Sequence, residues 1–249
     1  MSVFAVALVG LPEVAPGDDL AALIAAAAQE GVRDGDVLVV AHKVVSKAEG
    51  RIRALSQVDP GPLARSLAVD HGKDPRHVQV ILDESAQLLR AQRGILVCVT
   101  HHGFVCANAG VDASNAPAPD TVVLLPSDPD ASARALRERL REMTGAAPAV
   151  VITDSFGRPW RHGQVDVAIG CAGLHPLDDW RGRGDAAGRK LRATWIALAD
   201  EVAAAADLVR SKDSREPAVL VRGLERHVTP DDGPGAAVLR RPAAEDLFR

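Results

Sequence analysis

The sequence predicts an α+β fold, with mixed sheets and hairpins packed against helices. Short apolar runs rich in β-branched residues are interspersed with longer Ala- and Leu-rich segments. Two of the apolar runs, 95–100 and 104–107, are separated only by His101-His102-Gly103, which is typical of a β-hairpin. Strands and helices therefore do not alternate strictly, and this disfavours a doubly wound parallel sheet.

Each expected strand is a short apolar run bounded by Gly, Pro or polar residues. The first run, 4–9, stops at Gly10 and Pro12. The expected strands, in chain order, are residues 4–9, 36–40, 78–82, 95–100, 104–107, 121–125, 149–153, 194–198 and 218–221, and a further apolar run covers 165–169.

The expected helices carry start and stop signals. Asp18 and Asp19 precede an Ala/Leu-rich body that stops at Gly31, and Asp128 or Asp130 is expected to cap an amphipathic segment. The expected helices are 20–31, 62–69, 132–145 and 200–210; polar loops are expected at 41–47, 110–115 and 172–190. We expect a single domain over 1–249, with residues 229–249 as a C-terminal surface arm.

Composition narrows the classes of partner. The chain has 249 residues, of which 47% are hydrophobic, so it can bury a sizeable core. The net charge of −4 and the absence of Tyr disfavour a nucleic-acid partner.

No apolar run approaches the roughly 20 residues of a membrane span, and the three cysteines show no C-x-x-C spacing. We expect a reduced, cytoplasmic protein with no membrane partner, whose N-terminus is a strand and not a signal peptide.

Polar side chains follow several of the expected strands, where a rigid scaffold presents reactive groups. Asp112 and Asp154 are accompanied by Asn115 and Ser155. Oxygen ligands of this kind suit Mg²⁺ or Mn²⁺. An Asp-Ser pair after a strand is also common as a turn or helix cap, so both interpretations stay open on the residues alone.

Those cations usually serve phosphates, and a triphosphate needs further positive charge. Lys47, Arg158 and Arg161 are candidates for that role. Neither G-x-x-x-x-G-K-[ST] nor G-x-G-x-x-G after a strand occurs, so a nucleotide site would be of another type.

Six ordered segments together resemble one family. They are VGLPEVAPGDDL, DVLVVAHKVVSKAEG, ILDES, ANAGVDASN, VITDSFGRPWRHGQVDVAIGCAGL and ADEVAAAADLV. The chain resembles the coenzyme F-420-0:L-glutamate ligase (F-420 γ-glutamyl ligase) family over residues 4–249. Some bacterial members carry a fused nitroreductase-like domain; this chain resembles the stand-alone form.

The resemblance implies an enzyme that uses GTP and divalent metal to add L-glutamate, and then γ-linked glutamates, to F-420-0 through an acyl phosphate. It implies an intertwined homodimer and two ions of Mg²⁺ or Mn²⁺, with K⁺ as a further candidate ion. The residues that it assigns to the nucleotide are Leu11, Pro12, Glu13, Val14, Lys47 and Asn115. It assigns Asp112, Asp154 and Ser155 to metal, and we expect Arg158 and Arg161 to hold the substrate's phosphodiester or glutamate.

Two departures from the family pattern affect these expectations. His42 stands where the family often has Ser or Thr, which leaves its nucleotide contact open. Lys212 lies where some members place a metal-binding Gln, so either Asp213 substitutes or Lys212 contacts phosphate. The alternatives to a ligase are a metal-dependent nucleotide phosphohydrolase and a non-catalytic GTP-binding module. Glu84 and Glu201 are open candidates for a general base.

Overall fold

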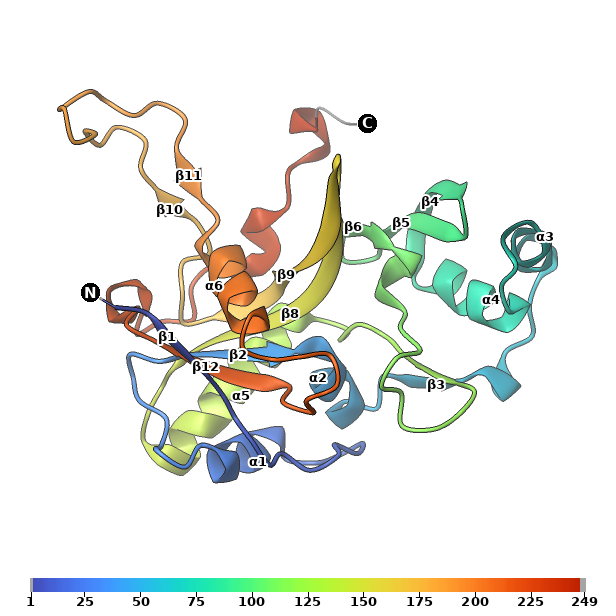
Figure 1. Ribbon diagram of the computed structural model, residues 1–249, viewed down its shortest axis with the longest axis horizontal. Coiled ribbons are helices and arrows are strands. Elements are labelled where there is room, and N and C mark those ends of the chain that lie inside the picture. The colour runs from blue at the N-terminus through green and yellow to red at the C-terminus, as the bar shows by residue number, and fades with distance from the viewer. Residues whose placement is uncertain (1, 247–249) are drawn as a thin grey trace.

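The computed structural model describes residues 2–246 and confirms the α+β class (Figure 1). Its main sheet has five strands in the order β1-β12-β2-β8-β9. Their bounds are Phe4–Ala7 for β1, Ala218–Arg222 for β12, Val37–Ala41 for β2, Ala149–Arg158 for β8 and Arg161–Ala172 for β9.

The sheet is mixed in direction. β2 and β8 run parallel, with Ala41 opposite Thr153 at their carboxyl ends. The other neighbouring pairs of this sheet are antiparallel. The central strands β2 and β12 are buried on both faces, which explains why they read as continuous Val- and Leu-rich runs.

Helices cover both faces of this sheet (Figure 1). Leu38 and Val40 face the core formed with α1 (Leu20–Ala27) and α5 (Pro129–Thr144). Val37 and Val39 face the opposite core, formed with α6 (Leu198–Asp207). Side chains alternate between faces along a strand, so each strand contributes to both cores.

A second lobe has its own apolar cluster, which includes Val78, Ile81 and Leu96. It contains α3 (Pro62–His71), α4 (Pro75–Asp83) and the antiparallel sheet β4-β5-β6. The strand bounds are Ser85–Gln92 for β4, Ile95–Thr100 for β5 and Val105–Ala107 for β6. The predicted hairpin at His101-His102-Gly103 is therefore confirmed. The pair β3 (Ile52–Ala54) and β7 (Thr121–Val123) joins the lobes.

The strand predicted at 78–82 is wrong, because this segment lies in α4. Asp74 caps the helix by accepting from the Arg76 amide, and Pro75 occupies its first turn. These start signals lie just before the apolar residues. They outweigh the β-propensity of Val78, Val80 and Ile81, which are buried as one face of the helix.

Two polar segments expected as loops or turns are regular structure. Residues 42–48 form a short helix, α2 (His42–Ala48), directly after β2. Asp154 and Ser155 lie within β8, which continues to Arg158 and turns back into β9 at Arg161. Pairing with β9 satisfies the backbone there, so neither a turn nor a helix cap is needed. The β8–β9 hairpin projects beyond the rest of the sheet (Figure 1).

The C-terminal part of the chain differs in detail from expectation. The strand expected at 194–198 is only β11 (Trp195–Ile196), which pairs with β10 (Asp178–Asp179) at the base of a projecting arm (Figure 1). The described tail runs over the surface, with Ala236 fully buried; residues 247–249 lie outside the described residues. Across residues 2–246, no helix is long and apolar enough to cross a membrane.

Candidate active site

Helix α2 lies at the centre of the predicted site. β2 and β8 are parallel and in register, with Ala41 opposite Thr153. The residues that follow, His42 and Asp154, therefore emerge side by side at the carboxyl edge of the sheet. Three side chains of α2 then contact three other segments that the sequence assigned to the site.

The first contact is between His42 and Asp154. The His42 Nε2 atom lies 3.3 Å from Asp154 Oδ1, and the two side chains are 2% and 16% exposed. This nitrogen is buried and makes no hydrogen bond within the described residues. Asp154 Oδ1 accepts a hydrogen bond from the Ser155 amide at 2.8 Å. The pair is thus close in space without being joined by a hydrogen bond.

The second contact is between Lys43 and Asp112. Lys43 Nζ lies 2.7 Å from Asp112 Oδ2 and also donates to Ser114 Oγ. Burial acts to raise the pKa of Asp112, but the hydrogen bond and charge of Lys43, together with hydrogen bonds from Ser114, hold that pKa below its usual value. Asn115 lies in the same turn, with φ of 55°.

The third contact is between Lys47 and Glu13. Lys47 is 4% exposed, and its ammonium group donates to the Glu13 carboxylate. Leu11 and Val14, which flank Pro12 and Glu13, are buried in the core. The side chains of Leu11 and Val14 therefore hold this segment in place, while Glu13 faces Lys47.

Ser155 points to the opposite face of β8 from Asp154. Its hydroxyl donates to Asp166 Oδ1 at 2.6 Å and accepts from Lys212 Nζ at 2.8 Å. Asp166, on β9, also accepts from Thr153 and Arg210. Burial acts to raise the pKa of Asp166, but these hydrogen bonds and the charge of Arg210 keep it lowered. Lys212, and not Asp213, is the side chain that reaches Ser155.

Arg158 and Arg161 are not brought to the carboxylates within one chain. They are register partners at the tip of the β8–β9 hairpin, about 13 Å along the strand from Asp154 at the usual rise per residue. Arg158 donates to the His162 carbonyl oxygen at 2.6 Å. The two base candidates also lie elsewhere: Glu84 pairs with Arg51, and Glu201 is exposed in the first turn of α6.

The arrangement fits a divalent cation with oxygen ligands. Asp112 and Asp154 offer carboxylate oxygens near the first turn of α2, and within the described residues Asp154 Oδ2 accepts no hydrogen bond. Residues 2–246 hold no group of three or more His, Cys, Asp or Glu side chains arranged for a metal. One or two carboxylates completed by phosphate oxygens and water are the usual set for Mg²⁺.

Sequence reasoning missed three residues at this site. Lys43 was assigned no role, although it pairs with Asp112. Asp166 was assigned no role; a lone Asp in the apolar run 165–169 was the signal that a buried partner exists. Arg210 was treated as a helix end, and only the fold brings it to Asp166.

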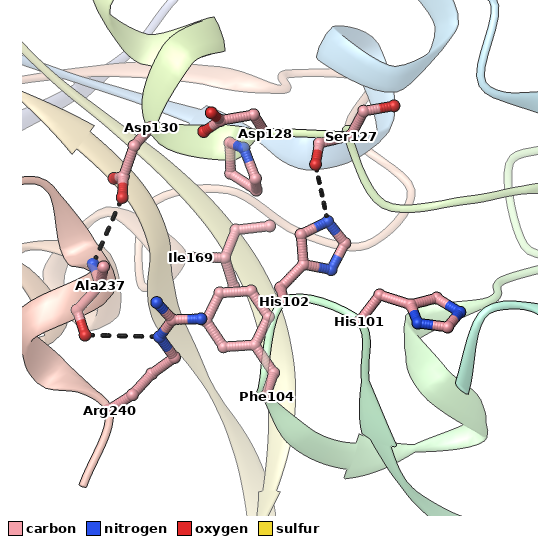
Figure 2. Close-up of a pocket in the computed structure, with 10 residues that line it drawn as sticks. His101, His102, Phe104, Ser127, Asp128, Asp130, Ile169, Ala237 and Arg240 are labelled. Carbon is pink, nitrogen blue, oxygen red and sulfur yellow. Dashed lines mark hydrogen bonds between the residues drawn. The ribbon is translucent and has the colours of Figure 1, made fainter. Parts of the chain in front are cut away.

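A separate hollow of about 260 Å³ lies between the β5–β6 turn, the start of α5 and the tail (Figure 2). Arg240 lies over the ring of Phe104 at 5.7 Å, and His102 contacts the Ser127 carbonyl oxygen. None of the predicted site residues lines it. The predicted site residues thus lie around α2 and not in this hollow.

Comparison with known proteins agrees with the motifs around α2. The family described as F420-0:Gamma-glutamyl ligase matches residues 9–223. A coenzyme F420:L-glutamate ligase of Methanopyrus kandleri is 49% identical over 240 residues, covering 95% of this chain and 94% of that protein. A protein of the same name from Methanothermobacter thermautotrophicus is 45% identical, covering 100% of this chain and 100% of that protein. Another, from Haloarcula marismortui, is 44% identical, covering 100% of this chain and 96% of that protein. The chain therefore belongs to the F420-0:gamma-glutamyl ligase family, and it is a ligase that forms carbon–nitrogen bonds.

Proposed function

We propose that this protein is a GTP- and divalent-metal-dependent ligase of F420 biosynthesis that attaches L-glutamate, and then γ-linked glutamates, to F420-0. The observation that carries the proposal is the convergence on α2. His42, Lys43 and Lys47 contact Asp154, Asp112 and Glu13. Segments far apart in the sequence, each with groups suited to a nucleotide or a cation, thus meet at one short helix.

The reaction must activate a carboxylate, because a carboxylate and an amine do not condense spontaneously in water. The terminal phosphoryl group of GTP moves to a carboxylate oxygen of F420-0, and GDP leaves. The α-amine of glutamate then attacks the acyl carbon; the bond to phosphate breaks, the nitrogen loses a proton, and an amide, GDP and phosphate result. Anionic groups must approach one another at each stage, so positive charge is the main catalytic requirement.

The chain supplies part of that charge itself. Lys43 and Lys47 extend from α2, and Lys212 reaches the other face of β8 at Ser155. Leu11 and Val14 have buried side chains, so contacts of residues 11–14 with GTP would come from backbone groups, Pro12 and Glu13. We assign Asn115 to the nucleotide as well, since it shares a turn with Asp112.

Asp112 and Asp154 would hold Mg²⁺ or Mn²⁺. When bound, such a cation neutralises phosphate oxygens and the charge that develops during transfer. Ser155 faces away from Asp154 and towards Lys212, so a second ion at Ser155 would have to compete with an ammonium group. A K⁺ ion remains part of the proposal only as an additional counter-charge.

We propose that the protein works as a homodimer. The β8–β9 hairpin and the β10–β11 arm project from the body (Figure 1), and they expose Trp160 and Trp195. Arg158 and Arg161, at the hairpin tip, would then hold the phosphodiester or the glutamate carboxylate at a site completed by the partner.

The decisive experiment is incubation with F420-0, GTP, Mn²⁺ and L-glutamate, followed by mass spectrometry of the deazaflavin product. Successive additions of one glutamyl unit are expected, together with one GDP for each unit. GTP hydrolysis that needs neither glutamate nor F420-0 would instead identify a phosphohydrolase. Tight GTP binding without any ligated product would identify a binding module.

A further inference from the structure

His42 is a buried imidazole whose Nε2 atom has no hydrogen-bond partner within the described residues. Its side chain is 2% exposed, and Nε2 lies 3.3 Å from Asp154 Oδ1. A buried polar atom without a partner is costly and calls for an explanation. The partner that Nε2 lacks would therefore lie next to the Asp154 carboxylate.

The separation of the two atoms suits a shared cation. Two ligands at right angles on an octahedral ion, each with a bond of about 2.1 Å, lie about 3.0 Å apart. Nδ1, on the other side of the ring, lies 3.4 Å from Ser46 Oγ. A proton on Nδ1 donated to Ser46 leaves a lone pair on Nε2, beside Asp154 Oδ1 but not aimed at it. Holding the far ring nitrogen by a second group is the usual way in which a metal-binding histidine is oriented.

We propose that His42 Nε2 and Asp154 together bind one divalent cation, which makes this a mixed nitrogen–oxygen site selective for first-row transition cations such as Mn²⁺ and Co²⁺ over Mg²⁺. The inference rests on the proposed function for the presence of a cation at Asp154. Imidazole nitrogen contributes more to binding of transition cations than to binding of Mg²⁺, which prefers oxygen ligands. Phosphate oxygens and water would complete the coordination.

The test compares wild-type protein with His42→Gln. Mn²⁺ binding by the full chain is followed through the electron paramagnetic resonance signal of free Mn²⁺, first with metal alone and then with GDP; Mg²⁺ affinity is measured by competition. We expect His42→Gln to weaken Mn²⁺ binding about tenfold or more and Mg²⁺ binding less than about threefold. Equal Mn²⁺ affinity in the two proteins would overturn the proposal.

His102→Gln is the matched control. His102 also has a buried nitrogen without a hydrogen-bond partner, but it lies in the separate hollow of Figure 2 and forms no ion pair with a carboxylate in the described part of the chain. This variant should bind both cations as wild type does. A similar Mn²⁺ loss in His102→Gln would show that the effect of His42→Gln is not specific.

A direct measurement needs no variant and no turnover. Bound Mn²⁺ in wild-type protein should show a nitrogen coupling in pulsed electron paramagnetic resonance, and ¹⁵N-labelled histidine should change that coupling. Bound Mn²⁺ without a histidine coupling, or no bound Mn²⁺ under either condition, would contradict the proposal. If the protein shows nitrogen coupling but forms no glutamyl product, the cation site is supported and the proposed reaction is rejected.

Discussion

Arg210 donates a hydrogen bond to Asp166 although the two residues are 44 positions apart in the chain, and their side chains are 8% and 4% exposed. Arg210 lies beyond α6, whereas Asp166 lies on β9. The same carboxylate accepts from Thr153 and Ser155, on β8. This buried network links β8 to β9 beside Asp154, where the two strands are still paired.

Breaking this pair should destabilise the fold strongly. Arg210→Met leaves a buried carboxylate without its main counter-charge, which costs about 3–5 kcal/mol. The matched control is Arg65→Met, because Arg65 and Asp59 form an ion pair with 60% and 96% exposed side chains; such pairs contribute about 0–1 kcal/mol. Urea unfolding measures both free energies. Equal effects would show that the Asp166 network adds no stability of its own.

Asp154→Asn should keep the fold and lose glutamyl transfer. Asn has one neutral carbonyl oxygen where the cation would meet a carboxylate, and we expect the rate to fall at least about a hundredfold. Asp185→Asn, in the exposed arm, is the control and should retain activity. Turnover is compared at matched Mn²⁺ concentration. Wild-type activity in Asp154→Asn would remove this carboxylate from the mechanism.

Lys212→Met should impair use of GTP more than it impairs folding. Lys212 Nζ lies 2.8 Å from Ser155 Oγ and 3.4 Å from Asp207 Oδ1, but its side chain is 73% exposed. Losing its charge near the phosphates should raise KM for GTP about three- to tenfold, since a hydrogen bond to a charged group contributes about 1.5–3 kcal/mol before screening by solvent. Lys190→Met serves as control. An unchanged KM would place the ammonium outside the nucleotide site.

The cysteines should be unreactive in the folded protein. Burial, with a smaller contribution from Asp154, raises the pKa of the Cys106 thiol to about 12, and burial raises that of Cys171 to about 12 as well. Only a thiolate reacts readily, so at pH 8 a thiol reagent should modify neither until urea is added. Mass spectrometry of peptides locates any modification; rapid labelling of Cys106 without denaturant would contradict this burial.

Asp200→Asn should leave the protein as stable as wild type or more stable at neutral pH. Burial raises the pKa of Asp200, against the hydrogen bond from the Ala168 amide. A raised carboxyl pKa means that the folded state holds the Asp200 proton more tightly than the unfolded state does. Ionised Asp200 therefore lowers the stability of the fold once pH rises above the pKa that this group has in the unfolded chain. Asn keeps an acceptor for the amide and carries no charge, and the gain should be up to about 1 kcal/mol.

The pH dependence provides the check on that assignment. Thermal melting of the two proteins should diverge as pH rises from 4 towards neutrality, in favour of Asp200→Asn. Below the unfolded pKa both side chains are uncharged, and the difference should vanish. A variant that is less stable at pH 7 would show that the carboxylate contributes an interaction beyond the Ala168 hydrogen bond.

Local signals predicted much of the fold. Asp128 caps α5, and the turn at His101-His102-Gly103 joins β5 to β6. The signals failed where two of them competed. Residues 78–82 are a short, mostly apolar run like a strand, but the cap at Asp74 and Pro75 starts a helix there. The polar segment after β2 was expected to be a loop, whereas it forms α2 and its Lys47 is buried against Glu13.

The sequence by itself determined the α+β class, the family and the identity of the chemical groups, because apolar periodicity and ordered motifs are properties of neighbouring residues. Tertiary structure decided which of those groups meet. Parallel pairing of β2 with β8 places His42 beside Asp154, and strand alternation sends Ser155 to the other face, to Asp166 and Lys212. Such contacts join residues far apart in the chain, and only the packing of the sheet against its helices specifies them.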